Sequence, residues 1–295
     1  MNKTHEQKMW DRDYIIMEAS DVLTGYVGEQ VTIRQLYYQL VNRGMPNSQS
    51  YYKRVVGAME KARWSGVISF DAFVDHERGL VCETSWEDTD LGETIRNGEE
   101  NVLFLMDYYS LNRWENQPEY IEVWIEKKAL QGVVLPVCEK LDVGLFPCKG
   151  YPSLTALNEA YMRFNAAYLQ GKHVTILYCG DHDPSGDDIP RSVVDNLKRM
   201  GMYSLDLERI ALTYDQVEEY HLPPAPTKTT DTRSASWGGH GQVELDAVDP
   251  SELRRLIEEA VLGHFDPDLY DGLKRREEEE GREYRKAIKT FVNNL

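Results

Sequence analysis

Several hallmarks of common protein classes are missing from this sequence of 295 residues. No apolar run approaches the roughly 18 residues of a membrane-spanning helix, and the first residues, Met1 to Asp13, are polar and charged, unlike a signal peptide. We therefore expect a cytoplasmic protein. The four cysteines are far apart and form no Cys-x-x-Cys pair, which argues against a zinc knuckle or a disulfide framework and predicts buried thiols. The chain also has no P-loop or other ATPase signature.

Basic residues are scarce: 33 Lys and Arg stand against 50 Asp and Glu, for a net charge of −17. This balance argues against a nucleic-acid partner, because phosphate contacts depend on clustered Lys and Arg. Their distribution matters more than the total, since basic residues outnumber the single acid, Glu60, between Val31 and Gly66. They can form a positive patch for a duplex or an ordinary solvated face. These basic residues are Arg34, Arg43, Lys53, Arg54, Lys61 and Arg63.

The N-terminal region, residues 1–83, has the pattern of a winged helix-turn-helix domain. Apolar residues recur there at helical spacing in three segments, and two short apolar runs follow that are typical of a β-hairpin. In this motif the last helix enters the major groove of DNA, and basic side chains contact phosphates. The helices are expected over Glu6 to Tyr26, Thr32 to Arg43 and Ser50 to Trp64, and the strands over Val67 to Phe70 and Gly79 to Cys82.

Beyond an acidic, partly helical connector at residues 84–118, strands and helices alternate. This alternation predicts an α/β domain with a parallel, doubly wound sheet at residues 119–221. A helical C-terminal extension, residues 222–295, is expected to pack on that domain. The strands are expected over Tyr120 to Ile125, Val143 to Pro147, Val174 to Cys179 and Leu207 to Ala211, and the helices over Lys127 to Leu141, Ser153 to Leu169, Ile189 to Met200, Pro250 to Leu262 and Leu269 to Asn293.

Three acidic residues follow two of these strands directly. Glu126 comes after the first strand, and Asp181 and Asp183 come after the third. The carboxyl ends of parallel strands meet at one edge of a sheet, so the three side chains are expected to converge there. Clustered carboxylates repel one another unless they share a cation, and their oxygens favour Mg²⁺ or Mn²⁺. The pattern predicts a metal site, although Asp-x-Asp-Pro-x-Gly can also be only a turn that caps a helix.

With these residues the sequence resembles the TOPRIM domain, which topoisomerases, primases and certain nucleases share. The motifs Ile125-Glu126-Lys127, Lys149-Gly150-Tyr151-Pro152 and Asp181-x-Asp183-Pro184-x-Gly186 resemble successive strand-end motifs of the topoisomerase VI A subunit and its relative, the meiotic double-strand-break protein. That family places a winged helix before the TOPRIM domain, so the resemblance covers both domains in order, roughly Val31 to Arg191. It implies a winged helix followed by a Rossmann-like TOPRIM domain.

The family's nucleophilic tyrosine lies in a stretch that corresponds here to Thr32-Ile33-Arg34-Gln35-Leu36-Tyr37-Tyr38. By this resemblance Tyr38 is the candidate nucleophile and Arg34 its phosphate-binding partner, while Gln35 replaces the family's usual acid. Tyr37 belongs to the apolar stripe of its helix, so we expect Tyr38 to be the exposed one of the pair. A phenol attacks phosphate poorly unless a cation lowers its pKa or a base removes its proton. Both tyrosines can instead simply pack the domain.

The leading hypothesis is metal-dependent cleavage of double-stranded DNA by transesterification, as in a type IIB topoisomerase, with Glu126 at the metal. The resemblance implies a homodimer in which the tyrosine of one protomer meets the metal of the other, and it allows an ATPase partner that the sequence does not identify. One alternative is a hydrolytic TOPRIM nuclease that uses metal-bound water. Another is a non-catalytic DNA-binding or assembly module, which the net charge favours. Lys149 is a further candidate DNA contact, and His182 a candidate proton shuttle.

Overall fold

The structure is a computed structural model that describes residues 10–26, 30–74, 90–224 and 241–293. The chain divides into two compact units: one takes in residues 1–79 and 121–263, and the other residues 80–120 and 264–295. Within the described ranges, no helix combines the length and the apolar character needed to cross a membrane. The candidate site lies entirely in the first unit.

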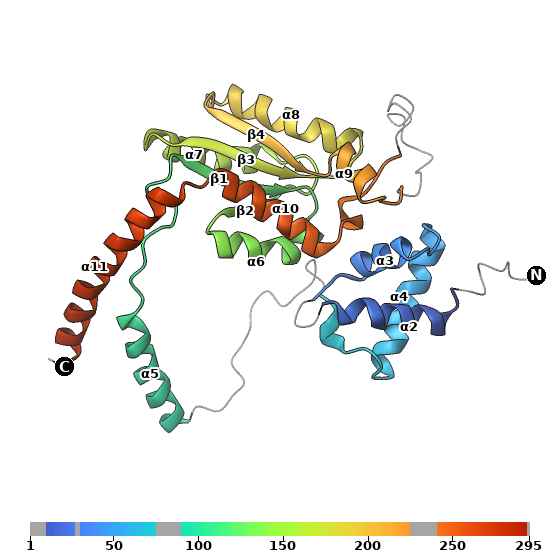
Figure 1. The fold of residues 1–295 in the computed structure, drawn as a ribbon, viewed down its shortest axis with the longest axis horizontal. Coiled ribbons are helices and arrows are strands. Elements are labelled where there is room, and N and C mark those ends of the chain that lie inside the picture. The colour runs from blue at the N-terminus through green and yellow to red at the C-terminus, as the bar shows by residue number, and fades with distance from the viewer. Residues whose placement is uncertain (1–9, 27–29, 75–89, 225–240, 294–295) are drawn as a thin grey trace, which may run out of the picture. The chain divides into compact units, whose positions relative to one another are not determined.

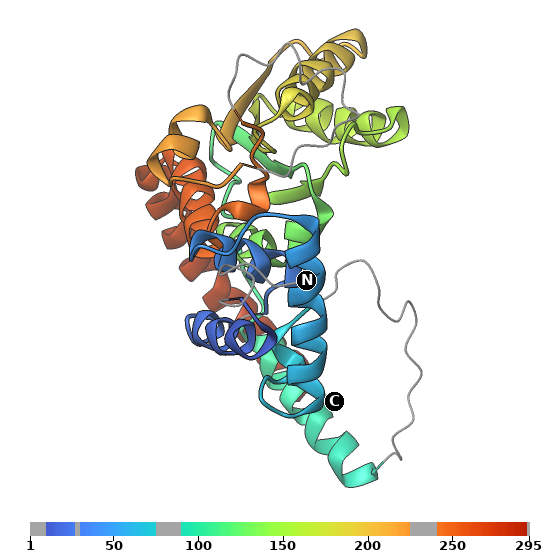
Figure 2. The ribbon, with the colours of Figure 1, turned by 90° about the vertical axis from the view of Figure 1, so that its right-hand side faces the viewer.

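Three helices at the N-terminus of the first unit pack against one another (Figure 1, Figure 2). They are α2 (Arg12–Thr24), α3 (Ile33–Asn42) and α4 (Gln49–Trp64), and each begins after a side chain that accepts a hydrogen bond from the first turn. At α3 the N-cap is Thr32, as the sequence predicts, and the Gln35 side chain completes a capping box by accepting from the Thr32 backbone N–H at 2.7 Å. The second and third predicted helices are therefore confirmed, and the first begins at Arg12, after the Asp11 cap, instead of near Glu6.

The predicted strand from Val67 to Phe70 is wrong. The chain turns there and enters a short 3₁₀ helix, η1 (Phe70–Ala72), because the Ser69 hydroxyl accepts from the Asp71 backbone N–H at 3.2 Å and so favours a turn. Only an isolated parallel bridge between Val31 and Phe73 follows in the described part of this region. The second predicted strand, Gly79 to Cys82, lies outside the described residues. The winged-helix assignment thus stays a prediction.

A four-stranded parallel sheet forms the centre of the first unit, in the order β2-β1-β3-β4 (Figure 1). Its strands are β1 (Glu119–Ile125), β2 (Gly144–Pro147), β3 (His173–Cys179) and β4 (Leu205–Ala211). The two central strands are buried along most of their length, and Trp124 and Tyr178 on them are fully buried, as expected for parallel strands covered on both faces. The predicted α/β class and all four predicted strands are confirmed.

Helices cover both faces of the sheet (Figure 1). On one face lie α6 (Gln131–Leu141), after the 3₁₀ turn η2 (Lys128–Leu130), and α10 (Pro250–Gly263). On the other lie α7 (Leu154–Leu169) and α8 (Pro184–Arg199), and a short helix, α9 (Tyr214–Glu219), follows β4 without having been predicted. The connections from β1 to β2 and from β3 to β4 run in opposite directions across the sheet. The switch point of the fold therefore lies between β1 and β3.

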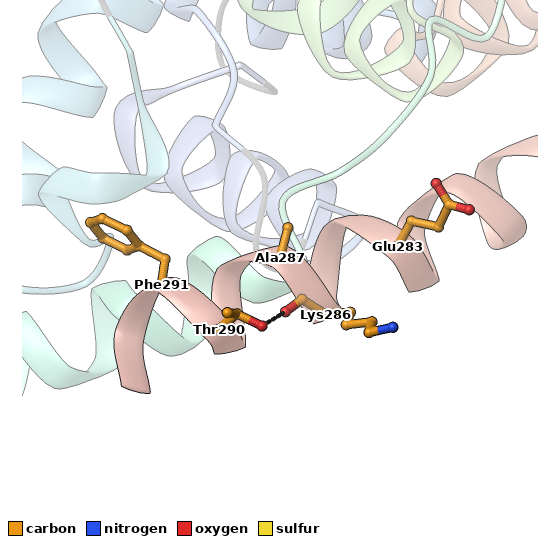
Figure 3. A pocket seen from close by; sticks show the side chains of 5 residues that line it. All are labelled: Glu283, Lys286, Ala287, Thr290 and Phe291. Atoms are coloured by element: carbon orange, nitrogen blue, oxygen red, sulfur yellow. Dashed lines mark hydrogen bonds between the residues drawn. The ribbon is translucent and has the colours of Figure 1, made fainter. Parts of the chain in front are cut away.

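The second unit is built from α5 (Leu91–Met106) and α11 (Pro267–Asn293), which pack against each other. The backbone N–H of Leu111, just beyond α5, donates to the Glu277 carboxylate at 2.8 Å, and Tyr109 donates to Glu280. A shallow hollow lies on α11, where Phe291 is exposed and the Thr290 hydroxyl donates to the Lys286 carbonyl at 2.9 Å (Figure 3). The hollow is lined by Glu283, Lys286, Ala287, Thr290 and Phe291.

Candidate functional site

Glu126 and Asp181 lie together at the switch point. The backbone N–H of Glu126 donates to the carbonyl of Cys179, the last residue of β3, at 2.8 Å. The Asp181 N–H in turn donates to Glu126 Oε2 at 2.9 Å. The Gly150 N–H of the Lys-Gly-Tyr-Pro turn donates to the Glu126 carbonyl at 3.3 Å, so a third predicted motif adjoins the same place. The structure therefore brings these strand-end motifs to one edge of the sheet, as the sequence predicts.

The turn after β3 is folded tightly around the Asp181 backbone. An added Cβ on Gly186 would lie 2.0 Å from the Asp181 carbonyl oxygen, so only glycine fits at that position. The Asp181 side chain is buried, and its Oδ1 accepts from the Leu245 backbone N–H at 2.8 Å. One oxygen of Asp181 is thus engaged by a segment that lies far along the chain.

Asp183 is the N-cap of α8. Its Oδ1 accepts from the Gly186 backbone N–H at 2.6 Å, and Pro184 follows at the first helical position. The helix consequently begins well before the predicted start near Ile189. The alternative in which the Asp-x-Asp-Pro-x-Gly turn caps a helix thus describes the Asp183 side chain, and a role for Asp183 as a metal ligand stays a prediction.

Crowding of carboxylates and burial affect the pKa of Glu126. Burial raises the pKa of Glu126, and the nearby charges of Asp181 and Asp183 raise it further, to about 7, against the lowering effect of the Asp181 N–H. Burial also raises the pKa of Asp181, although the Lys127 ammonium opposes that shift. Both Asp181 and Asp183 are therefore close enough to Glu126 to repel its charge.

Lys127 supplies a cation at the centre of this acidic cluster. Its Nζ lies 3.0 Å from Asp181 Oδ1, 2.9 Å from Glu244 Oε2 and 2.8 Å from Asp246 Oδ2. Burial alone would lower the pKa of Lys127, but Asp246, Asp181 and Glu244 outweigh burial and raise it. Burial would likewise raise the pKa of Glu244, yet Lys127 and Arg34 lower it to about 2. Lys127 and Glu244 are therefore both charged at neutral pH.

Helix α3 contributes Arg34 and Tyr38 to the same network. Arg34 pairs with Glu244, its Nε lying 3.1 Å from Oε2, and its guanidinium carbon lies 5.8 Å from the centre of the Tyr38 ring. The predicted exposure of Tyr38 is wrong: the side chain is 2% exposed, and its neighbour Tyr37 is 3% exposed. Packing of α3 against the 3₁₀ turn η4 (Leu245–Ala247) helps to cover this part of the helix, which the periodicity of α3 alone does not reveal.

The Tyr38 hydroxyl is poorly suited to act as a nucleophile in this conformation. Burial raises its pKa, and the charge of Glu244 raises it further, while Arg34 and Lys127 lower it only in part. Arg34, the predicted phosphate-binding partner, and Lys127 are thus both within electrostatic reach of Tyr38, but Glu244 and Asp246 pair with these two cations.

The predicted DNA-binding residues have different surroundings. Lys53, Arg54 and Lys61 on α4 are exposed, and so is Lys149, which has a left-handed backbone conformation with φ 55°. Arg43 pairs with Asp21 at 2.5 Å and with Glu18 at 3.2 Å. Arg63 is half-buried and lies over the rings of Phe70 and Phe73. The exposed lysines and Arg54 therefore remain the best placed for phosphate contacts.

The acidic edge fits a hard divalent cation by its chemistry, but it is not a formed metal site. Across the part of the chain that the structure describes, no three His, Cys, Asp or Glu side chains are grouped so that they could hold a metal ion. Glu126, Asp181 and Asp183 nevertheless offer carboxylate oxygens, which are the ligands that Mg²⁺ and Mn²⁺ prefer. Asp246 is fully buried, and its Oδ1 has no hydrogen-bond partner among the described residues. A cation at Asp181 would compete with the Lys127 ammonium.

Three members of this cluster were not predicted from the sequence: Lys127, Glu244 and Asp246. Lys127 was part of a quoted motif without a role. Glu244-Leu245-Asp246 shows an acid-x-acid pattern like that of Asp181 and Asp183, but among the residues described just before it, 241–243, only Val243 forms a β-bridge. The signal that could have pointed to it is the pair of acids itself, in a segment otherwise free of periodicity.

The cysteines agree with the prediction where the structure describes them: Cys138, Cys148 and Cys179 are free and buried. Burial raises the pKa of each of these thiols. His182 is also buried, and its backbone N–H donates to the Val243 carbonyl at 2.8 Å. This contact ties the turn after β3 to the segment that carries Glu244.

Comparison with known proteins yields no relative: no family model, no curated protein and no solved structure matches the chain. The function must therefore be argued from the site itself.

Proposed function

We propose that the protein is a metal-dependent enzyme that cleaves the DNA backbone, with Glu126, Asp181 and Asp183 as ligands of Mg²⁺ or Mn²⁺. The observation that carries this proposal is the meeting of Glu126 and Asp181 at the switch point, joined by a hydrogen bond of 2.9 Å. The pKa of Glu126, raised to about 7 by burial and by its acidic neighbours, is typical of clustered carboxylates in a site that binds a shared cation. On this interpretation the sheet is a TOPRIM domain and the three N-terminal helices belong to a winged helix.

When bound, a divalent cation supplies Lewis-acid stabilisation of a phosphoryl oxygen and lowers the pKa of water. The chain's own residues would do the rest. Lys127 and Arg34 place two positive charges beside the carboxylates, where they can stabilise charge on a phosphate. The exposed Lys53, Arg54 and Lys61 of α4 would contact the phosphates of the duplex independently of its sequence.

Hydrolysis is the form of cleavage that the geometry favours. The Tyr38 hydroxyl is buried and its pKa is raised, so a water molecule at the carboxylate edge is the more accessible nucleophile. One observation supports tyrosine transesterification as a second candidate: Tyr38 lies on α3 beside Arg34, within the electrostatic reach of Lys127. That route requires a rearrangement that exposes the hydroxyl, such as the dimeric arrangement that the family resemblance implies.

Plasmid cleavage by Tyr38→Phe decides between the two routes. Purified protein is incubated with supercoiled DNA and Mg²⁺ or Mn²⁺, and the products are analysed with and without protease digestion. Under hydrolysis the unmodified protein and Tyr38→Phe cut alike and leave no protein on the DNA. Under transesterification Tyr38→Phe loses both cleavage and the covalent adduct. Glu126→Ala is the negative control. If neither the unmodified protein nor its variants cleave the plasmid, the proposed function is refuted in favour of a non-catalytic DNA-binding module.

A further inference from the structure

Two cations from distant parts of the first unit converge on a single carboxylate oxygen. Arg34 on α3 and Lys127 after β1 both contact Glu244 Oε2, Arg34 Nε at 3.1 Å and Lys127 Nζ at 2.9 Å. The Arg34 Nη2 atom approaches the same oxygen. Because the two side chains come from elements more than 90 residues apart, this convergence is a product of the tertiary fold.

Arg34, Lys127 and Glu244 are each partly exposed to solvent. The Arg34 side chain is 42% exposed, that of Lys127 23% and that of Glu244 17%. A guanidinium and an ammonium that donate to one oxygen anion form the arrangement that proteins use to bind phosphate groups. Lys127 also lies 3.0 Å from Asp181, so an anion bound here would adjoin the carboxylate edge.

The Glu244 side chain can leave this position without a change in the backbone. On one side of Glu244, Val243 and His182 exchange backbone hydrogen bonds of 2.8 and 3.0 Å. On the other side, Leu245 is fully buried and donates its N–H to Asp181. The backbone is therefore fixed on both sides, and rotation of the partly exposed Glu244 side chain would free the Arg34 and Lys127 donors that it occupies, while Lys127 keeps its contacts with Asp181 and Asp246.

We propose that Arg34 and Lys127 form a phosphate subsite in which the Glu244 carboxylate takes the place of a DNA backbone phosphate. The anion that replaces Glu244 is a phosphodiester of the duplex, and Glu244 weakens DNA binding by competing for the same two cations. This inference rests on the proposed function, because it is the proposed DNA substrate that would bring a phosphodiester to the edge formed by Glu126 and Asp181. Asp246 keeps a carboxylate on Lys127, at 2.8 Å, when the Glu244 side chain turns away.

Anion binding by Glu244→Gln tests the proposal without any cleavage. The full chain is titrated in EDTA with inorganic phosphate and, separately, with a short fluorescent duplex, by calorimetry and by anisotropy. Glutamine has nearly the same shape as glutamate but no charge, so it competes less for Arg34 and Lys127. We expect both ligands to bind about tenfold more tightly, as the loss of a competing charge-assisted hydrogen bond predicts.

The matched control is Glu252→Gln, which removes the same charge from a residue that pairs with Arg255 and Tyr220 instead. This variant should bind both ligands as the unmodified protein does. Adding Arg34→Gln to Glu244→Gln should abolish the gain, because the subsite then lacks one of its two cations. If Glu244→Gln folds poorly, Glu244→Asp can replace it. Aspartate keeps the charge but its shorter side chain moves the carboxylate away from Arg34 and Lys127, so a smaller increase in affinity for both ligands is expected.

Unchanged affinity for both ligands in Glu244→Gln would overturn the proposal, as would a gain that Glu252→Gln reproduces. Tighter binding of inorganic phosphate alone would overturn the assignment to DNA. These results are independent of catalysis. If Glu244→Gln gains anion affinity but the unmodified protein cuts no plasmid, the subsite is supported and the proposed function is contradicted. If the unmodified protein cuts plasmid but Glu244→Gln gains no anion affinity, the proposed function is supported and the subsite is contradicted.

Discussion

The replacement Glu126→Gln tests whether the acidic edge is built to receive a cation. In the folded protein the pKa of Glu126 is about 7, compared with an ordinary value of 4.5. Because the folded-state value is the higher one, protonation of Glu126 favours folding. This contribution is fully present below about pH 4.5 and is lost as the pH rises through about 7. Glutamine mimics the protonated acid and can still accept from the Asp181 N–H.

The magnitude follows from the pKa difference. At ~1.4 kcal/mol per pKa unit, ionised Glu126 costs about 3 kcal/mol of folding free energy, and solvent at the partly exposed side chain screens this to about 1–3 kcal/mol. Glu126→Gln should therefore stabilise the metal-free protein by that amount at about pH 8.5 and by almost nothing at about pH 4.5.

Urea unfolding in EDTA at both pH values measures the effect, and Glu259→Gln, which neutralises an exposed acid paired with Arg255, is the control. Mg²⁺ should then stabilise the unmodified protein at the higher pH, by about 2.7 kcal/mol at a concentration 100 times its Kd, and should have a smaller effect on Glu126→Gln. Equal stability of Glu126→Gln and the unmodified protein at about pH 8.5 would refute the argument from carboxylate crowding.

Two further predictions concern the turn after β3. Asp183→Ala should lower the free energy of unfolding by about 1 kcal/mol, because α8 loses its N-cap. Asp183→Asn should keep the cap and lose only the stabilisation that depends on the metal. Urea unfolding with and without Mg²⁺ separates the two roles, and equal stability of the two variants in EDTA would contradict the capping role. Gly186→Ala should destabilise the protein by about 2 kcal/mol or more, since the added Cβ would lie 2.0 Å from the Asp181 carbonyl oxygen. Thermal unfolding measures this effect. A melting temperature equal to that of the unmodified protein would contradict the close approach of Gly186 to Asp181.

Local patterns in the sequence were enough to predict most elements of the fold. The capping residues Thr32 and Ser153 precede helices that begin where expected, because an N-cap acts within its own first turn. The alternation of short strand-like segments with helical segments predicted the four strands, because β-α units in series build a parallel sheet. The meeting of Glu126 and Asp181 followed from the same reasoning, since parallel strands carry their carboxyl ends to one edge.

Other features were not decided by the spacing of apolar residues. The capping role of Asp183 was recognised only as an alternative, since a helix start and a ligand motif use the same residue types. The predicted strand at Val67 gave way to a turn because one serine hydroxyl found a backbone N–H nearby. The prediction that Tyr38 is exposed was wrong, because helical periodicity indicates which face of a helix is apolar but not which segments pack against its other faces.

The sequence by itself thus determined the order of elements, the parallel sheet and the edge at which Glu126 and Asp181 meet, because these follow from interactions between near neighbours and from the direction of the strands. Only the tertiary structure decided which charges surround that edge. Lys127 meets Glu244 and Asp246 across more than a hundred residues, and Arg34 joins them from α3. Such ion pairs depend on how distant segments pack, and neither spacing nor composition encodes that packing.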